Sequence, residues 1–274
     1  MRADGVPVSP EWLLLREPAD AAARSAELAE HVGRRLSAAA TLVIHDLGGG
    51  SGAMGRWLAP RLPGPQHWVV HDRDVGLLEL AAADAPGPAA DGAAVTVEAR
   101  RSDIIRLAPR DLAGASLIVA SAVLDMLTAE GLAGMLGACT AIRCCPVLLA
   151  LTVVGHVVLT PADPLDARLA AAFNVHQRRT TTAGPLLGPD ALAAAVDELR
   201  GTGAELVVRP SPWRLDALHA DLTAEWFAGW VAAACEQEPA LAAETGAYRH
   251  RRLAQAAAGQ LAVTVDHADL LVLP

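Results

Sequence analysis

The sequence predicts an α/β protein with a doubly wound, mostly parallel sheet of seven strands. Short apolar runs rich in β-branched residues alternate with Ala- and Leu-rich segments of helical length, which is the rhythm of β-α-β units. A glycine cluster, residues 46–52 (Asp-Leu-Gly-Gly-Gly-Ser-Gly), directly follows the first apolar run. With 274 residues, 53% of them hydrophobic, the chain is long enough to bury a sizeable core.

The order of the elements follows from these runs. Strands are predicted over 41–46, 66–72, 95–99, 116–120, 147–153 and 204–208, and helices between them over 53–62, 77–85, 128–142 and 189–199. Residues 156–160 either extend the fifth strand or form a return. The chain is expected to close with strand segments 261–265 and 269–273, with His267 in a hairpin between them.

Two parts of the chain are expected. Residues 10–40 have a helical pattern, so residues 1–40 are predicted to form an N-terminal helical cap. Residues 41–274 are predicted to form a Rossmann-like domain with helical insertions at about 160–180 and 218–258.

Charge and hydropathy limit the partners. The formal net charge is −9 and the Arg pairs are scattered, so no nucleic-acid partner is expected. No segment approaches the roughly 20 apolar residues of a membrane span, and the N-terminus lacks a signal-peptide pattern. A cytoplasmic protein with a small-molecule substrate is therefore expected, while the oligomeric state is not predicted.

The chain contains no lysine. This excludes the Schiff-base lysine of pyridoxal enzymes and the phosphate-binding lysines of nucleotide triphosphatases and kinases. The four cysteines, Cys139, Cys144, Cys145 and Cys235, fit no zinc-binding spacing, so no metal site is expected.

The glycine cluster has the properties of a cofactor-binding loop. Glycines permit positive φ and let the backbone approach a ligand closely. The N-terminus of the following helix favours an anionic or carboxylate-bearing group. Asp72, at the end of the second predicted strand, lies 20 residues after Gly52, where a carboxylate accepts hydrogen bonds from ribose hydroxyls.

Two cofactor classes use such a loop. Residues 50–55 match the G-x-G-x-x-G pattern of dinucleotide-binding proteins, whereas residues 46–52 match D-x-G-x-G-x-G. The apolar run ends before Gly48, which favours the second pattern with Asp46 at the strand tip. The dinucleotide alternative would leave two glycines inside the strand, where glycine weakens pairing.

The loop, Asp72, the pair Ser102-Asp103 and the segment 121–125 resemble, in this order, the motifs of the class I, Rossmann-like methyltransferases that depend on S-adenosylmethionine (SAM). The resemblance covers about residues 41–155, 189–210 and the last strand, and it implies an antiparallel last strand. It implies that Asp46 and the loop glycines contact the methionine moiety, Asp72 the ribose and Asp103 the adenine amine. Ser121 would border the transferred methyl group. The implied cofactor-binding residues are Asp46, Gly48, Gly49, Gly50, Gly52, Asp72, Arg73, Asp103, Ile104 and Ser121.

A base is needed if the acceptor is protonated. Since the chain has no lysine and one tyrosine, histidines and carboxylates are the candidates. His156 follows the fifth strand directly, and His176 lies on the helix after it, so both are candidate catalytic residues. A surface or core role is the alternative for each. Arg16 or Arg24 of the first helix is a candidate for the carboxylate of the cofactor.

The sequence therefore predicts a SAM-dependent methyltransferase that acts on an O, N or C atom of a small molecule. Two alternatives stay open. One is an NAD(P)-dependent oxidoreductase, and the other is a non-catalytic cofactor-binding protein on the same fold.

Overall fold

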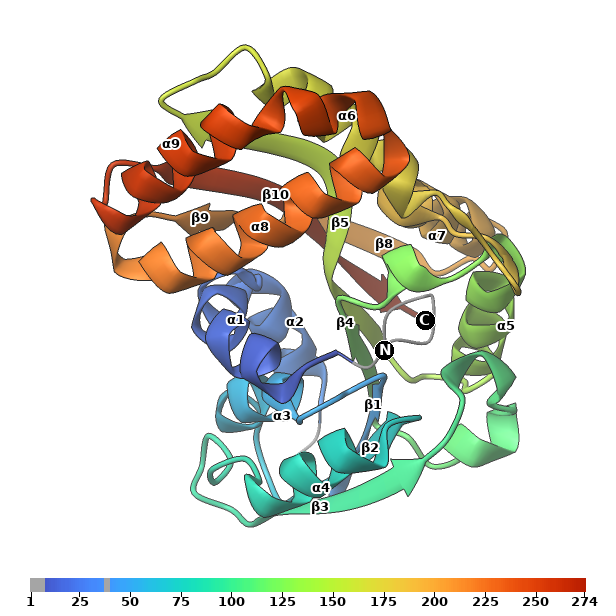
Figure 1. Ribbon diagram of the computed structural model, residues 1–274. Helices are drawn as coiled ribbons and strands as arrows, with labels where there is room; N and C mark the ends of the chain where they lie inside the picture. The colour runs from blue at the N-terminus through green and yellow to red at the C-terminus, as the bar shows by residue number, and fades with distance from the viewer. Residues whose placement is uncertain (1–7, 37–39) are drawn as a thin grey trace.

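A computed structural model describes residues 8–36 and 40–274. Its centre is one twisted sheet with the strand order β3 (Val95–Arg101), β2 (Gln66–Asp72), β1 (Leu42–Leu47), β4 (Leu117–Ser121), β5 (Val147–Thr160), β10 (Ala262–Leu273) and β8 (Glu205–Pro210). Strands β1 to β5 run parallel, and β10 is antiparallel to both of its neighbours. The predicted doubly wound sheet with an antiparallel last strand is thus confirmed (Figure 1).

The end of the chain differs from the prediction in two respects. The sheet has an eighth strand, β9 (Trp213–Leu215), which pairs with the first half of β10. The predicted hairpin around His267 is wrong, because residues 262–273 form one continuous strand. Two bulges, between Val265 and His267 and between Ala268 and Leu270, absorb the break in the apolar pattern.

Helices cover both faces of the sheet. On one face, α2 (Ala26–Arg35), α3 (Ala53–Leu58) and α4 (Val75–Ala83) pack on β1 to β4 through Leu28, Trp57, Trp68 and other apolar side chains. On the other face, α5 (Ala129–Thr140) and α7 (Ala191–Arg200) pack on β4, β5 and β10. This three-layer arrangement leaves the carboxyl ends of the parallel strands as the natural place for a ligand.

The described part of the N-terminal segment forms two helices. Helix α1 (Pro10–Ala23) ends before Ser25, whose side chain accepts a hydrogen bond from the backbone N–H of Leu28 and caps α2. The predicted helical pattern continued to residue 40, but residues 37–39 lie outside the described part of the chain. The break turns the chain so that α2 joins the core of the sheet while α1 crosses the sheet's carboxyl edge.

Beyond this edge β5 and β10 continue as a long ribbon. Residues 156–160 extend β5, one of the two outcomes expected for them. Helices α6 (Asp166–Gln177), α8 (Ala220–Gln237) and α9 (Thr245–Ala257) pack around the ribbon and β9, and Figure 1 shows this group at the top of the view. Between α6 and α7 lies the small hairpin of β6 (Thr180–Thr181) and β7 (Gly184–Pro185).

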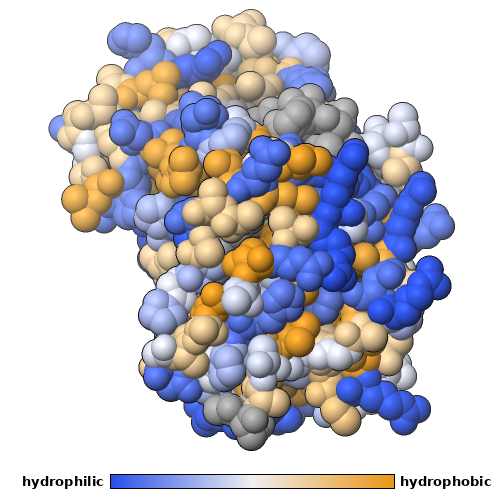
Figure 2. Space-filling model, turned by 90° about the horizontal axis from the view of Figure 1, so that it is seen from below, coloured by the Kyte–Doolittle hydropathy of each residue, from blue (hydrophilic) through white to orange (hydrophobic). Residues whose placement is uncertain are grey.

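None of the helices in residues 8–36 and 40–274 is long and apolar enough to cross a membrane. On the face in Figure 2, hydrophilic and apolar side chains are interspersed rather than separated into large patches.

Candidate functional site

The glycine loop connects β1 to α3 at the carboxyl edge of the sheet. Gly48, Gly50 and Gly52 have φ angles of +68°, +53° and +84°, which other residues adopt at a cost. The backbone N–H groups of Gly48 and Gly49 donate to the carbonyl oxygen of His71, over 2.8 and 3.1 Å. The loop is therefore held against the end of β2.

Neighbouring side chains pack closely against the backbone of this loop. A Cβ atom on Gly49 would lie 2.6 Å from Oδ2 of Asp46, and one on Gly48 would lie 2.8 Å from Cγ1 of Val123. Because real Cβ atoms do not approach so closely, the loop needs glycine at both positions. The missing Cβ of Gly49 leaves room for the Asp46 carboxylate directly under the loop.

Asp46 is a buried carboxylate without a hydrogen-bond partner. Its side chain is 0% exposed, and neither carboxylate oxygen has a partner within the described residues. Burial raises the pKa of Asp46 to about 7, although the positive charge of Arg24 opposes this shift. A buried acceptor with this pKa is a place where a ligand cation would be held.

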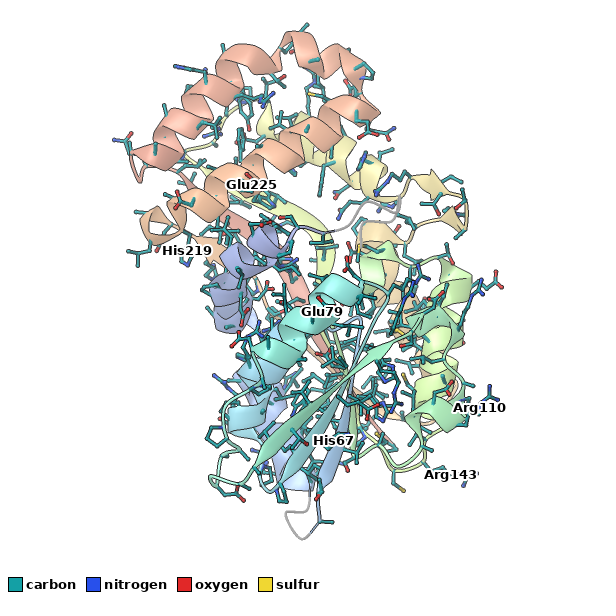
Figure 3. All side chains as sticks on the ribbon, turned by 60° about the horizontal axis from the view of Figure 1, so that its bottom comes forward. His67, Glu79, Arg110, Arg143, His219 and Glu225 are labelled. Carbon is teal, nitrogen blue, oxygen red and sulfur yellow. The ribbon has the colours of Figure 1, made fainter. Side chains whose placement is uncertain are left out.

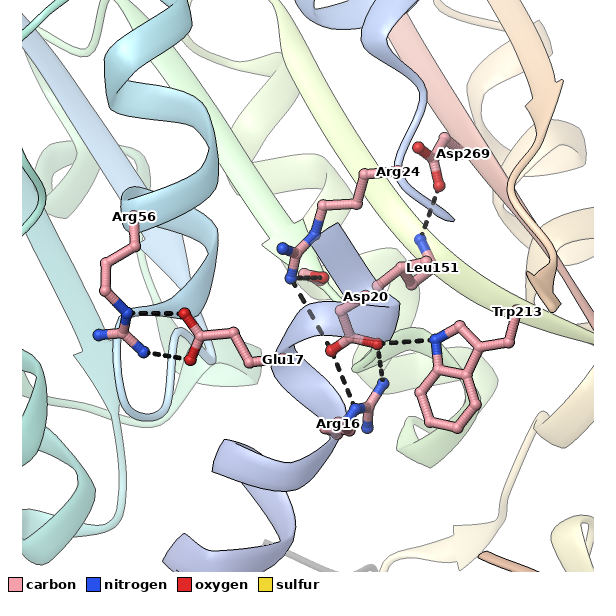
Figure 4. A network of polar contacts seen from close by, with 9 residues as sticks. Arg16, Glu17, Asp20, Arg24, Arg56, Leu151, Trp213 and Asp269 are labelled. Carbon is pink, nitrogen blue, oxygen red and sulfur yellow. Dashed lines mark hydrogen bonds and ion pairs between the residues drawn. The ribbon is translucent and has the colours of Figure 1, made fainter. Parts of the chain in front are cut away.

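Arg24 is the nearby buried cation, at the C-terminal end of α1. Its Nη2 donates to Oγ of Ser121 over 3.2 Å and lies 4.0 Å from Asp20 (Figure 4). Its Nε and Nη1 have no partner among the described residues, and burial lowers the pKa of the guanidinium. Nε and Nη1 of Arg24 and both oxygens of Asp46 are therefore buried polar atoms without a hydrogen-bond partner among the described residues.

Asp72, the predicted ribose ligand, ends β2 beside the loop. One carboxylate oxygen accepts from the backbone N–H of Gly50 over 3.0 Å, and the other from that of Asp74 over 2.9 Å. A carboxylate oxygen accepts two hydrogen bonds. Each oxygen therefore keeps one lone pair that a ribose hydroxyl can use.

Asp103 follows β3, and the predicted residue Arg73 forms an ion pair with it. Arg106 lies 3.5 Å from the other oxygen, and the backbone N–H of Ile105 donates to Asp103 over 3.3 Å. Asp103 thus caps the short helix after it, while its predicted contact with adenine stays a prediction. Ile104 lies close to the loop, since its Cδ1 would be 3.6 Å from a Cβ on Gly48.

The predicted cofactor-binding residues thus come together from the ends of β1, β2, β3 and β4. We refer to Asp46, Asp72 and Asp103 as the strand-end carboxylates.

Helix α1 packs against the glycine loop. Leu13 Cδ1 would lie 3.7 Å from a Cβ on Gly50. Glu17 forms a bidentate ion pair with Arg56 of α3, over 2.7 and 2.6 Å, and Arg56 also donates to the carbonyl of Ser51 in the loop. Helix α1 is therefore attached to the loop it covers (Figure 4).

Two buried carboxylates fix the other side of α1. Asp20 accepts from Arg16 over 2.9 and 3.1 Å and from the indole N–H of Trp213 over 2.9 Å. Asp269 of β10 accepts from the backbone N–H groups of Ser25 and Leu151, both over 2.8 Å. Asp269 therefore holds the turn that carries Arg24.

Sequence reasoning missed these long-range contacts. Glu17 and Arg56 are 39 residues apart, and Asp269 lies 244 residues from Ser25. Periodicity within a helix or strand reports only neighbours on one element, such as Asp20 and Arg24, which are four residues apart. An acidic residue inside the apolar last strand was the one available signal for Asp269.

The two histidines proposed as bases lie elsewhere. His156 has a side chain 66% exposed and pairs with Asp266 over 2.7 Å on the β5–β10 ribbon. It lies six residues beyond Ala150, which pairs with Ser121, and thus about 20 Å along the strand from the end of β4. His176 pairs with Glu236 of α8 over 3.3 Å. The structure does not bring either of them to the glycine loop, and a role as base stays a prediction.

Asp125 is a carboxylate that sequence reasoning did not select as a base. It lies two residues after Val123, which contacts the glycine loop, in a single helical turn after β4. Burial raises the pKa of Asp125 to about 6, against the positive charges of Arg16 and Arg179. A carboxyl group with this pKa is ionised at neutral pH and basic enough to accept a proton.

Solved structures with this architecture are known. The cyclopropane synthase MmaA2 from Mycobacterium tuberculosis matches 99% of this chain and 95% of its own, with a TM-score of 0.50 and 14% identity. A SAM-dependent methyltransferase from Methanosarcina mazei matches 89% of this chain and 96% of its own (TM-score 0.49, 11% identity). One from Thiobacillus denitrificans, in complex with S-adenosyl-L-homocysteine (SAH), matches 98% and 100% (0.46, 14%). No protein-family model and no curated protein sequence matches the chain.

The strand order and the similarity to MmaA2 show that the chain has the Rossmann-like fold of the class I SAM-dependent methyltransferases. At 14% identity, this similarity shows the fold alone. Fold alone does not determine activity, which depends on the residues of the site.

Proposed function

We propose that the protein is a SAM-dependent methyltransferase with a small-molecule acceptor. The observation that carries this proposal is the pair of buried, incompletely bonded groups at the glycine loop, the Asp46 carboxylate and the Arg24 guanidinium. SAM ends in an α-amino acid, which has an ammonium and a carboxylate group. The pair offers one group of opposite charge to each end of this zwitterion.

The other residues fit the rest of the molecule. Asp72 has two lone pairs for the ribose hydroxyls, and Ile104 offers an apolar surface beside Gly48 for the adenine ring. When bound, SAM supplies a methyl group on a positively charged sulfur. The chain's own contribution is to orient this group, exclude water with α1 and place an acceptor opposite it.

We propose Asp125 as the general base for an acceptor that carries a proton. Its carboxylate would take the proton from the acceptor's hydroxyl or amine as the methyl group is transferred. Its place two residues after Val123 and its pKa of about 6 support this role. The net charge of −9 favours a small molecule over a nucleic acid as the acceptor.

The dinucleotide alternative has less support in the structure. Strand β1 runs to Leu47, so Gly48 is the first residue of the turn. The one tyrosine, Tyr248, donates to Asp166 in the group of helices around the ribbon. Because the chain has no lysine, Tyr248 cannot form the tyrosine–lysine pair that short-chain dehydrogenases need.

The test of the proposed function is transfer of a labelled methyl group. Purified protein is incubated with methyl-labelled SAM and fractions of a small-molecule extract, and label in a product is measured together with formation of SAH. The proposal predicts both. SAH binding without transfer to any fraction would favour the non-catalytic alternative.

A further inference from the structure

A polar residue precedes each of the strand-end carboxylates in the chain. These residues are His45, His71 and Ser102. Because neighbouring side chains of a strand point to opposite faces of the sheet, His45 and His71 lie on the face opposite to Asp46 and Asp72. The three polar residues therefore form a second layer behind the proposed cofactor site.

These three side chains are joined by hydrogen bonds, and we refer to them as the histidine chain. Nδ1 of His45 lies 2.9 Å from Nε2 of His71, and Nδ1 of His71 lies 2.9 Å from Oγ of Ser102. The two rings are stacked with centroids 5.1 Å apart and planes inclined by 22°. His45 is 3% exposed and His71 is 0% exposed. The histidine chain thus connects β1, β2 and the end of β3 inside the protein.

The charge of the rings limits each nitrogen atom to one role in these hydrogen bonds. Burial lowers the pKa of both histidines to about 4, so each neutral ring has one donor and one acceptor nitrogen. If Nδ1 of His45 donates to His71, and Nδ1 of His71 donates to Ser102, the hydroxyl can donate to the carbonyl of Arg100, 3.4 Å away. In this arrangement His45, His71 and Ser102 each donate one hydrogen bond.

His71 also holds the glycine loop. Its carbonyl oxygen accepts from the N–H groups of Gly48 and Gly49, over 2.8 and 3.1 Å. The carbonyl of the next residue, Asp72, accepts from the N–H of Ser102 over 2.9 Å. One residue therefore contacts the loop through its backbone and both neighbouring strand ends through its ring.

We propose that His71 is a positioning residue for the cofactor. Through the histidine chain, His71 fixes the positions of the ends of β1, β2 and β3 relative to one another, and thereby the spacing of the strand-end carboxylates. This inference rests on the proposed function, because it assigns the residue to the binding of SAM. The His71 ring affects the affinity for SAM only if binding requires a fixed spacing of the strand-end carboxylates.

Calorimetric titration with SAH tests this proposal. His71→Phe keeps a stacked ring but removes both hydrogen bonds, and we expect the Kd of SAH to rise about tenfold, equivalent to about 1.4 kcal/mol. His71→Asn retains a donor near the place of Nδ1, and we expect it to restore part of the affinity through Ser102. His67→Phe is the matched control, because His67 lies on the same strand and face but contacts Thr96 and Glu98 near the surface (Figure 3).

The outcomes separate a positioning role from a general effect on stability. The proposal predicts that His67→Phe lowers the melting temperature without changing the Kd, whereas His71→Phe changes both. If His71→Phe fails to fold, Ser102→Ala, which removes one hydroxyl, must raise the Kd of SAH about threefold. Wild-type affinity in folded His71→Phe or in Ser102→Ala overturns the positioning role. Failure of the wild-type protein to bind SAH overturns the proposed function instead.

Discussion

At the scale of single residues, the buried Asp46 is the group on which the proposed function depends most. Its carboxyl is half protonated near neutral pH, since its pKa is about 7. A bound ammonium group favours the ionised form and lowers this pKa. Binding of the cofactor below pH 7 therefore has to release a proton.

The resulting prediction concerns the pH dependence of affinity. We expect the Kd of SAH to rise as the pH falls from 7 to 5, by up to about tenfold per pH unit, because ionising Asp46 then costs more. Titration calorimetry in buffers with different ionisation enthalpies will measure the released proton. An equal Kd at pH 5.5 and 7.5 would contradict the proposed contact.

The raised pKa of Asp46 also affects how the stability of the protein depends on pH. Its pKa is higher in the folded than in the unfolded state, so its contribution to stability is lost as the pH rises from about 4 to about 7. Asp46→Asn removes this effect and should stabilise the ligand-free protein more at pH 8 than at pH 5, by on the order of a few kcal/mol. Chemical denaturation at both pH values will measure the difference. Greater stabilisation by Asp46→Asn at pH 5 than at pH 8 would contradict the raised pKa of Asp46.

Asp125 is the residue for which structure and sequence lead to different proposals. We expect Asp125→Asn to lower turnover at least about a hundredfold while the Kd of SAH stays unchanged. Wild-type turnover should decrease below pH 6, as the carboxylate becomes protonated. Rates of His156→Ala and His176→Ala provide the comparison, and loss of turnover in one of these instead of Asp125→Asn would restore the histidine prediction.

At the scale of elements, α1 connects the glycine loop to the rest of the carboxyl edge. Its ion pair between Glu17 and Arg56 is mostly buried, with side chains 21% and 16% exposed, and it bridges two helices rather than two turns of one helix. Such a pair contributes more than a solvated surface pair does. The position of α1 over the loop therefore depends on this contact.

The prediction is that Glu17→Gln loosens α1. We expect faster hydrogen exchange of α1 amides, and a loss of stability of about 1 kcal/mol. Glu30→Gln is the control, because its ion pair with Arg34 has side chains 73% and 66% exposed. Equal exchange rates in α1 for wild type and Glu17→Gln would show that the ion pair does not hold the helix.

The elements themselves show how far the sequence could predict the fold. Strands β1 to β5 and the glycine loop were predictable because each is a short apolar run followed by a turn signal. The single strand β10 was not, because His267 and Asp269 interrupt its apolar pattern and the bulges that absorb them depend on pairing with β5. The break between α1 and α2 could not be placed from the sequence, because Ala- and Arg-rich sequence continues on both sides of Ser25 and this capping residue resembles an ordinary helical serine.

At the scale of the whole molecule, the sheet brings residues from the entire chain to one edge. Five elements contribute Arg24, Asp46, Asp72, Ser121 and Asp269, of which only the first four were candidates from sequence motifs and residue chemistry. The motif spacing of β-α-β units predicted which strand ends meet. The closure of the site by α1 depends on contacts between distant segments, which no local pattern records.

The most direct test of the central claim is calorimetric titration of the protein with SAH, with NAD as the comparison ligand. We predict binding of one SAH per chain, no binding of NAD, and loss of SAH affinity in both Asp46→Asn and Arg24→Met. Arg34→Met, on the exposed side of α2, should bind as the wild type does. Wild-type SAH affinity in both site variants, or binding of NAD in place of SAH, would contradict the account.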